Sequence, residues 1–367
     1  MCFMISVLTV LLSTLQTVSP KVSPKVVNQT VLWRSGKEGE VHLYRTPLLT
    51  YTPQGNLVAF NGARKYASAD MGPKFIAVRR STDKGLSWSP TAFVVDDGDR
   101  HVGLNVGSVI VDNTTATIFV MFVYCENCAH RSLLLINSTD DGQTWGEPRN
   151  ITSLVGADMV THPSPGFGIQ KKVGPAKGRL VVCGHGMPGG AGSLLLLSDD
   201  HGVTWRGGAF VSAIPFKGTR DSEFHPDECQ PVELPDGTIH IILRNHGRYR
   251  CHCKMVMRSY DGGETLSYRT MYFDGTLIEP RIASGLWYGG GVMYYTGPDS
   301  KTHREKMTLR WSYSNGTSWD GSLRVWERDA GYSTMTMLPQ DSTHLYILYE
   351  RGEKSSTQEI ALAIVQL

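Results

Sequence analysis

The sequence has little excess charge of either sign. Its 367 residues include 36 Lys and Arg against 34 Asp and Glu, which gives a net charge of +2. Proteins that bind nucleic acid present a clustered positive surface to the phosphates, so this balance argues against a nucleic acid partner. Long apolar runs are also scarce. The run at Phe3–Leu15 is too short to cross a bilayer, and no later run is long enough to predict a membrane helix.

This apolar run lies where a secretory signal peptide belongs, although no basic residue precedes it. We therefore expect a signal peptide at 1–20, a linker at 21–30 and one folded domain at 31–367. The alternative is a disordered leader with no targeting role. Secretion is also favoured by five Asn-X-Ser/Thr sequons, the acceptor pattern for N-glycosylation. The sequons begin at Asn28, Asn113, Asn137, Asn150 and Asn315.

The seven cysteines leave more than one interpretation open. Cys2 lies in the leader, and the other six lie in the expected domain, where they include one C-x-x-C and one C-x-C pair. These cysteines could form disulfides, remain buried free thiols or bind zinc. A structural zinc site needs four ligands at suitable spacing, and the two close pairs are far apart in sequence, so we expect no metal. The six are Cys125, Cys128, Cys183, Cys229, Cys251 and Cys253.

An eight-residue phrase, S-x-D-x-G-x-T-W, recurs along the chain at intervals of about 53 to 61 residues. A repeat of this length indicates an array of equal structural units. The copies at 138–145 and 198–205 match the phrase in full, the fourth copy ends in Leu instead of Trp, and the fifth has lost its Asp. The copies begin at Ser81, Ser138, Ser198, Ser259 and Ser312.

Each copy of the phrase has the chemistry of a tight turn between two strands. Asp and Ser side chains bond to nearby backbone groups, Gly adopts positive φ without steric cost, and Trp supplies an apolar anchor. Apolar runs of strand type, such as Leu133–Ile136 and Leu194–Leu197, precede the turns. Units of 50 to 60 residues suit the four-stranded blades of a propeller, and the chain has room for about six.

This phrase is the Asp-box, and with it the chain resembles the sialidase family. The resemblance spans about 31–367 and implies an all-β, six-bladed propeller that acts as an exo-α-sialidase, a glycoside hydrolase that releases terminal sialic acid. It implies no cofactor. Because other propellers also carry Asp-boxes, one alternative is a non-catalytic propeller that binds sialoglycans. Another is a trans-sialidase, which would use the same residues.

The family holds the carboxylate of sialic acid with three arginines, and the resemblance assigns this role to arginines at strand ends. Arginine suits the role because its planar fork pairs with a carboxylate through two bonds and stays charged. A fourth arginine, Arg64, matches a substrate-binding position, and Glu350 matches the glutamate that orients the first arginine. The three arginines of the cradle are expected to be Arg45, Arg244 and Arg310.

Three further residues match the catalytic positions of the family. Tyr332 would be the nucleophile, since a neutral phenol is not repelled by the substrate carboxylate, and Glu228 would be its base. Asp70 would protonate the leaving oxygen and then activate water. Asp227 competes locally with Glu228, but adjacent strand residues point to opposite faces, so we expect only one of them in the site.

The phrases around Cys183, Glu228, Cys251 and Arg310 resemble the branch of animal lysosomal sialidases. This resemblance implies turnover of sialylated glycoconjugates in the lysosomal lumen and a carboxypeptidase partner, protective protein/cathepsin A. A homo-oligomer is left open. His185 falls where the family lines the substrate pocket, and Asn105 is a further residue that could meet the substrate, although each also fits an ordinary turn.

Overall fold

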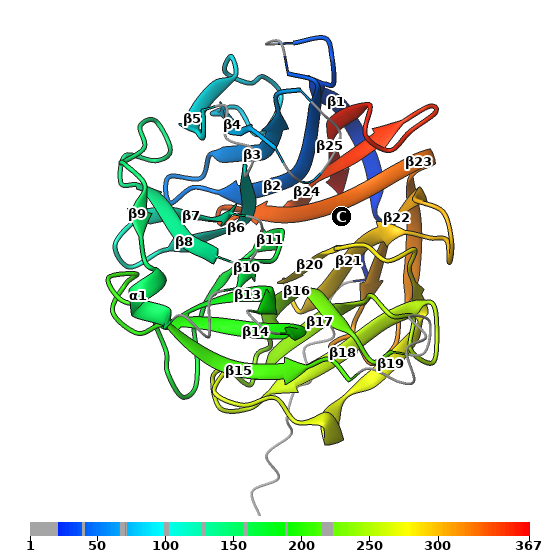
Figure 1. Cartoon of the computed structure of the whole chain (residues 1–367). Helices are drawn as coiled ribbons and strands as arrows, with labels where there is room; N and C mark the ends of the chain where they lie inside the picture. Colours follow the sequence, from blue (N-terminus) through cyan, green and yellow to red (C-terminus); the bar gives the residue numbers. More distant parts are fainter. Residues whose placement is uncertain are drawn as a thin grey trace, which may run out of the picture.

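The computed structural model describes residues 21–38, 41–66, 70, 72–98, 103–126, 130–156, 161–187, 190–214 and 223–367. The expected signal peptide at 1–20 lies outside these ranges. Within them, the regular elements are β-strands apart from one helical turn, α1 (Thr152–Val155), and one 3-10 turn, Tyr268–Thr270. The strands form sheets arranged around a common centre (Figure 1). The prediction of an all-β, propeller-like fold is confirmed.

Two sheets contain four antiparallel strands that follow one another along the chain. The first comprises β2 (Leu43–Tyr51), β3 (Leu57–Arg64), β4 (Lys74–Ser81) and β5 (Ala92–Asp96). The second comprises β16 (Pro226–Glu233), β17 (Ile239–Asn245), β18 (Cys253–Ser259) and β19 (Tyr272–Ile278).

Two further sheets have five strands each. One comprises β6 (Leu104–Asp112), β7 (Thr117–Glu126), β8 (His130–Ser138), β9 (Arg149–Asn150) and β11 (Gly166–Phe167), with β11 parallel to β6. The other comprises β10 (His162–Pro163), β12 (Ile169–Gln170), β13 (Leu180–Met187), β14 (Gly190–Ser198) and β15 (Arg206–Ser212).

The fifth sheet found in the described ranges has seven strands, and it joins the two ends of the chain. Its order is β1-β25-β24-β23-β22-β21-β20. The first part of β23 pairs with β22 and the second part with β24. Its strands are β1 (Lys25–Arg34), β20 (Gly285–Gly289), β21 (Val292–Pro298), β22 (Glu305–Ser312), β23 (Gly321–Leu338), β24 (Asp341–Gly352) and β25 (Glu359–Gln366).

Strand β1 corrects the expected linker at 21–30, because it begins at Lys25 and pairs with β25 from Lys25 to Arg34. Polar side chains and partial exposure along its first half hide the strand from sequence patterns. It is an edge strand, and only its end, at Leu32 and Trp33, is fully buried.

Apolar side chains fill the spaces between neighbouring sheets. One cluster joins β3 to β6 and β7 through residues such as Phe60, Val109 and Phe122. Another joins β3 to β24 and β25 through residues such as Leu57, Leu348 and Leu362. The apolar runs of the sequence are therefore buried on both faces of each sheet. No helix in the described ranges is long and apolar enough to cross a membrane.

The Asp-box turns are tight, as predicted, and each repeats the same hydrogen bond from the Gly N–H to the Ser hydroxyl. The N···O distances lie between 2.8 and 3.0 Å in all five copies. The Gly φ angle is positive in each, for example +80° at Gly142. In the fifth copy Ser314 replaces Asp, and its hydroxyl accepts the N–H of Ser318 at 3.0 Å, as Asp83 accepts that of Ser87 at 2.9 Å.

The boxes define one end of each sheet, which we call the box end. In the first sheet Ser81 lies opposite Leu57, whereas Lys74 lies opposite Arg64. In the β16–β19 sheet Ser259 lies opposite Ile239, the residue that begins β17. Arg64 and Arg244, near the other ends of their strands, therefore lie away from the boxes. We call this second end the site end.

Candidate active site

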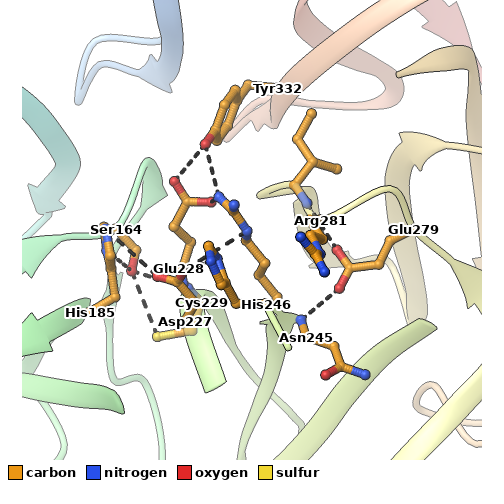
Figure 2. Close-up of polar contacts among 12 residues, drawn as sticks. Ser164, His185, Asp227, Glu228, Cys229, Asn245, His246, Glu279, Arg281 and Tyr332 are labelled. Carbon is orange, nitrogen blue, oxygen red and sulfur yellow. Dashed lines mark hydrogen bonds and ion pairs between the residues drawn. The ribbon is translucent and has the colours of Figure 1, made fainter. Parts of the chain in front are cut away.

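A tyrosine, a glutamate and an arginine meet at the site end. Figure 2 shows the hydroxyl of Tyr332 turned toward Glu228. The Tyr332 hydroxyl donates a hydrogen bond to Oε1 of Glu228 at 2.7 Å. Nη1 of Arg244 donates to Oε2 of Glu228 at 2.7 Å and to the Tyr332 hydroxyl at 3.2 Å. The phenol therefore lies between a carboxylate that can accept its proton and a fixed cation.

Irregularities in two strands aim these side chains inward. The register of β23 against β24 shifts between Ala330 and Ser333, on either side of Tyr332. The register of β16 against β17 shifts between Pro226 and Cys229, on either side of Glu228. A β-bulge redirects the side chains of the residues that it displaces, and bulges are common beside active sites.

The bulge in β16 overturns the expectation that Asp227 and Glu228 face opposite ways. Oδ2 of Asp227 lies 3.9 Å from Nε of Arg244, while Oε2 of Glu228 lies 2.7 Å from Nη1 of the same guanidinium. Both carboxylates therefore reach one arginine. The alternation rule holds for a regular strand, and the displaced register removes its basis here.

Tyr332 is neutral in this environment. Burial raises the pKa of its phenol most, and the neighbouring Glu228 carboxylate raises it further, against the opposing charges of Arg244 and Arg304. A neutral phenol donates its proton to Glu228 in a hydrogen bond, and it needs that base within reach to act as a nucleophile.

Glu350 is fully buried and joins the first arginine to the tyrosine strand. Its Oε1 accepts hydrogen bonds from Nε of Arg45 at 2.6 Å and from the N–H of Thr46 at 2.9 Å. Its Oε2 accepts the N–H of Tyr332 at 3.1 Å. Thr46 has a φ of +61°, an uncommon conformation for a β-branched residue that the bond to Glu350 supports. The expected pairing of Arg45 with Glu350 is present.

Asp70 meets Arg64 at this end of the first sheet. Nη2 of Arg64, which is buried, lies 2.5 Å from Oδ1 of Asp70, whose side chain is 87% exposed. Burial would raise the pKa of Asp70, but the charges of Arg64, Arg45 and Lys74 outweigh it and lower the pKa below its usual value. Residues 67–69 and 71, which complete the expected loop, lie outside the described residues.

Lys74 holds the chain around Asp70, and the sequence reading missed it. Its Nζ donates to the backbone oxygens of Asp70 at 2.7 Å and of Gly72 at 3.0 Å. Burial and the charge of Arg64 lower the pKa of Lys74 to about 8. Its position directly after a Gly-Pro pair gave no signal of this role.

Arg310 is not placed with this group. It lies within β22, two residues before the Asp-box serine Ser312, and its Nη2 pairs with Asp299 at 2.9 Å. Arg304 lies beside the tyrosine instead: its guanidinium carbon is 5.4 Å from the centre of the Tyr332 ring, compared with 5.7 Å for Arg45. Arg304 is adjacent to the start of β22, at the site end.

A buried ion pair supports the end of β17 behind Arg244, and sequence reasoning missed this pair too. Nζ of Lys254 lies 2.5 Å from Oε2 of Glu279, and both side chains are 1% exposed. Oε1 of Glu279 accepts the N–H of Asn245, the residue after Arg244, at 2.6 Å. Figure 2 shows Glu279 and Asn245 in contact. Glu279 therefore fixes the backbone from which Arg244 projects.

The two pocket candidates occupy different places. His185, in β13, has Nε2 3.8 Å from Oδ1 of Asp227 and Nδ1 3.4 Å from the Ser164 hydroxyl. His185 therefore lies beside Asp227, next to the group formed by Tyr332, Glu228 and Arg244. Asn105 is half-buried in β6 opposite Val123, near the end of its sheet away from the box at Ser138.

Four cysteines form disulfides. Cys183 of β13 is bonded to Cys229 of β16, and Cys251 is bonded to Cys253. The first bond links two neighbouring sheets at the residue after Glu228. Cys2 and Cys128, and the side chain of Cys125, lie outside the described residues. In the part of the chain that the structure describes, no group of three or more His, Cys, Asp and Glu residues is arranged to hold a metal ion.

The chain is similar to known proteins over most of its length. Residues 55–347 match the family model described as a BNR repeat-like domain. The chain is 32% identical to a sialidase of Micromonospora viridifaciens, over 87% of this chain and 51% of that protein. It is 26% identical to sialidase-3 of Rattus norvegicus, over 65% of this chain and 60% of that protein. The chain thus spans about half to three fifths of the length of these relatives.

A solved structure, the Hadza microbial sialidase Hz136, has a TM-score of 0.77 and 27% identity. It covers 91% of this chain, and the match covers 68% of that structure. These comparisons do not single out the animal lysosomal branch that the sequence motifs suggest. The chain therefore belongs to the BNR repeat-like domain family, and the relatives to which it is similar are sialidases.

Proposed function

We propose that the protein is an exo-α-sialidase that releases terminal sialic acid from glycoproteins, oligosaccharides and glycolipids. The observation that carries the proposal is the hydrogen bond of 2.7 Å from the Tyr332 hydroxyl to Glu228, with Arg244 in contact with both. A binding module needs cations for the substrate carboxylate, but it has no use for a buried phenol paired with a base.

In the proposed reaction, Glu228 accepts the phenol proton while the Tyr332 oxygen forms a bond to the anomeric carbon. The bond from that carbon to the leaving oxygen breaks, and Asp70 gives this oxygen a proton. Water then enters, and its oxygen forms a bond to the anomeric carbon while Asp70 takes a proton from it. The bond from that carbon to tyrosine breaks as Glu228 returns the proton to the phenol. Sialidases with a tyrosine nucleophile are an exception to the two-carboxylate scheme of glycosidases.

We assign the cradle for the substrate carboxylate to Arg45, Arg244 and Arg304, in place of the expected Arg310. The three guanidinium groups surround Tyr332: Nη1 of Arg244 lies 3.2 Å from its hydroxyl, and Arg45 and Arg304 lie over its ring. Arg64 would remain beside Asp70 and hold it near the leaving group. Bidentate pairing with a carboxylate favours arginine at each of these positions.

We also propose six blades. The seven-stranded sheet divides at β23, whose first part would be the outer strand of one blade and whose second part would belong to the next. With the other four sheets this division gives six units, in agreement with the spacing of the Asp-boxes. Strand β1 would complete the last blade beside β25.

For cellular context, we propose passage through the secretory pathway to the lysosomal lumen, with protective protein/cathepsin A as partner. The proposal rests on the motifs shared with animal lysosomal sialidases and on the sequons. Expression in cultured animal cells, followed by immunoprecipitation and co-staining with a lysosomal marker, tests both points. Exclusion from lysosomes and the absence of the carboxypeptidase from the precipitate would contradict them.

The activity is tested with the purified chain and a fluorogenic sialoside at acidic pH. We expect fluorophore release, and proton NMR of the first product should show the same anomeric configuration as the substrate, because two displacements restore it. Tyr260→Phe, an exposed tyrosine within an Asp-box, serves as the matched active control for later variants. Absence of release, or an inverted first product, would reject the proposed function.

A further inference from the structure

Asp227 occupies a buried position between the cationic groups of the site and two histidines from neighbouring sheets. Its Oδ2 lies 2.8 Å from Nδ1 of His246 and 3.9 Å from Nε of Arg244. Its Oδ1 lies 3.8 Å from Nε2 of His185 and accepts the backbone N–H of Glu228 at 2.9 Å. Figure 2 shows this carboxylate group beside Glu228 and Cys229, with His185 and His246 on either side. The proposed reaction does not use it.

The charge on Asp227 is maintained by its surroundings. Burial would raise the pKa of this carboxyl, but His185, His246 and Arg244 outweigh burial and lower the pKa well below its usual value. The backbone oxygen of Asp227 also accepts the hydroxyl of Ser193 at 2.5 Å, which ties the bulge to β14. The side chain is therefore an ionised carboxylate held on several sides.

The contacts of Asp227 and Glu228 divide the guanidinium of Arg244 between them. Asp227 faces Nε, and Glu228 and Tyr332 share Nη1. The remaining nitrogen, Nη2, donates no hydrogen bond to a residue that the structure describes. Arginine rotates about several bonds, so two carboxylates on different nitrogens fix the plane of the fork and leave Nη2 for an incoming carboxylate.

We propose that Asp227 is a positioning residue for the sialidase reaction, acting through Arg244 and Glu228, with His185 and His246 holding it in place. It orients the guanidinium toward the substrate carboxylate, and its bond to the N–H of Glu228 sets the direction of the base. This inference rests on the proposed function, because it assigns Arg244 to substrate binding.

The test compares Asp227→Asn, which keeps the shape but not the charge, with Asp227→Glu, which keeps the charge but not the length. We expect Asp227→Asn to lower kcat/KM by about 10- to 100-fold, the usual size of an effect transmitted through a supporting residue. Most of the loss should appear as a higher KM, since substrate binding is weakened in ground and transition states alike. Asp227→Glu should retain more activity than Asp227→Asn.

A packing role would reverse that order, because Asn fits the space of Asp whereas Glu overfills it. Asp236→Asn, an exposed carboxylate at the other end of the same hairpin, is the control and should stay within about twofold of wild type. Unchanged kcat/KM in Asp227→Asn, or lower activity in Asp227→Glu than in Asp227→Asn, would overturn the inference.

A crystal structure of Asp227→Asn separates this inference from the proposed function. The Arg244 guanidinium should rotate away from residue 227, and an unmoved Arg244 would refute the positioning role. If wild type neither hydrolyses a sialoside nor binds N-acetylneuraminate, the proposed function fails, while the position of Arg244 in the variant still decides whether Asp227 orients it.

Discussion

The box end and the site end of the sheets are built on opposite principles. At the box end, the hydrogen bond from the Gly N–H to the Ser hydroxyl joins residues of one eight-residue turn, and it repeats five times. At the site end, the Tyr332–Glu228 bond spans 104 residues of sequence and the Arg45–Glu350 bond spans 305. Local, repeated contacts stabilise units one by one, whereas each long-range contact occurs once and needs the whole ring.

This difference predicts that substitutions at the two ends affect different measurements. A change at the site end should reduce activity while the fold persists, because the scaffold does not depend on it. A change at the box end should lower the free energy of unfolding while the remaining folded molecules stay active. Each variant below is therefore measured for both activity and thermal unfolding.

The largest effect is expected for Tyr332→Phe. The ring and its packing remain, and only the hydroxyl that meets Glu228 is lost, so kcat should fall on the order of 10³-fold or more, as for removal of a nucleophile elsewhere. Binding of a sialic acid analogue, measured by calorimetry, should change little. Turnover equal to that of the Tyr260→Phe control would exclude a covalent role for Tyr332.

The next effect belongs to the box end. Trp205 is 2% exposed, and its Nε1 donates to the carbonyl oxygen of Gly202 at 3.2 Å. Trp205→Ala should lower the free energy of unfolding by about 3–5 kcal/mol. Leu266 occupies the same position in the fourth copy and is only partly buried, so Leu266→Ala should lower the free energy of unfolding by less than Trp205→Ala. A melting temperature equal to that of wild type would show that the box does not anchor its blade.

Arg304 and Arg310 are the two candidates for the third arginine of the cradle. Arg304 lies at the site end of β22, whereas Arg310 lies near its box end. Arg304→Lys should lower kcat/KM by roughly 10- to 100-fold, the loss of one charge-assisted hydrogen bond. Arg310→Lys should leave kcat/KM near that of wild type, since its partner is Asp299. The opposite ranking of the two variants would return Arg310 to the cradle.

The smallest effect is a displaced pH profile. The free-enzyme pKa of Asp70 is lowered, so its protonated, proton-donating form should be lost as pH rises through an acidic range, and kcat/KM should fall there. In Arg64→Gln the cation that lowers this pKa is gone. The pKa rises, the acid stays protonated to higher pH, and the alkaline limb moves upward. The profile is measured with a sialoside that has a poor leaving group. If its alkaline limb does not move in Arg64→Gln, Asp70 is not the general acid.

The same division explains what the sequence could predict. The five turns and the strands before them depend on neighbours in sequence, so their residue types are sufficient to identify them. Tyr332, Glu228, Arg244, Arg45 and Glu350 were assigned from family resemblance, and the structure brings these five together. No periodicity in the chain would have joined residues 104 or 305 positions apart.

The resemblance assigned Arg310 to the cradle, whereas in the structure Arg310 pairs with Asp299 and Arg304 lies over the Tyr332 ring. A signal against this assignment was present, because Arg310 lies only two residues before the Asp-box serine Ser312. Arg304 lies eight residues before the box serine, at the opposite end of β22. The length of β22, combined with the position of its Asp-box, places Arg310 near the box end of this strand and Arg304 at the site end.

The bulge in β16 and the bond from Cys183 to Cys229 were beyond sequence reasoning for a physical reason. A bulge depends on how two strands align, and the disulfide depends on how two sheets pack. Neither the bulge nor the disulfide produces a regular spacing of residue types in the sequence. Asp227 was therefore excluded from the site by a rule that its own strand does not obey.

The pairing of β1 with β25 has a consequence for how the protein is made. The ribosome synthesises Lys25 early and its partner Gln366 more than three hundred residues later. At about 5–20 residues per second, the nascent first strand waits roughly 20 to 70 seconds for its neighbour. Throughout that interval its edge remains open to other chains. Synthesis of β25, and not translation of any single repeat, thus sets the earliest moment at which the ring can close.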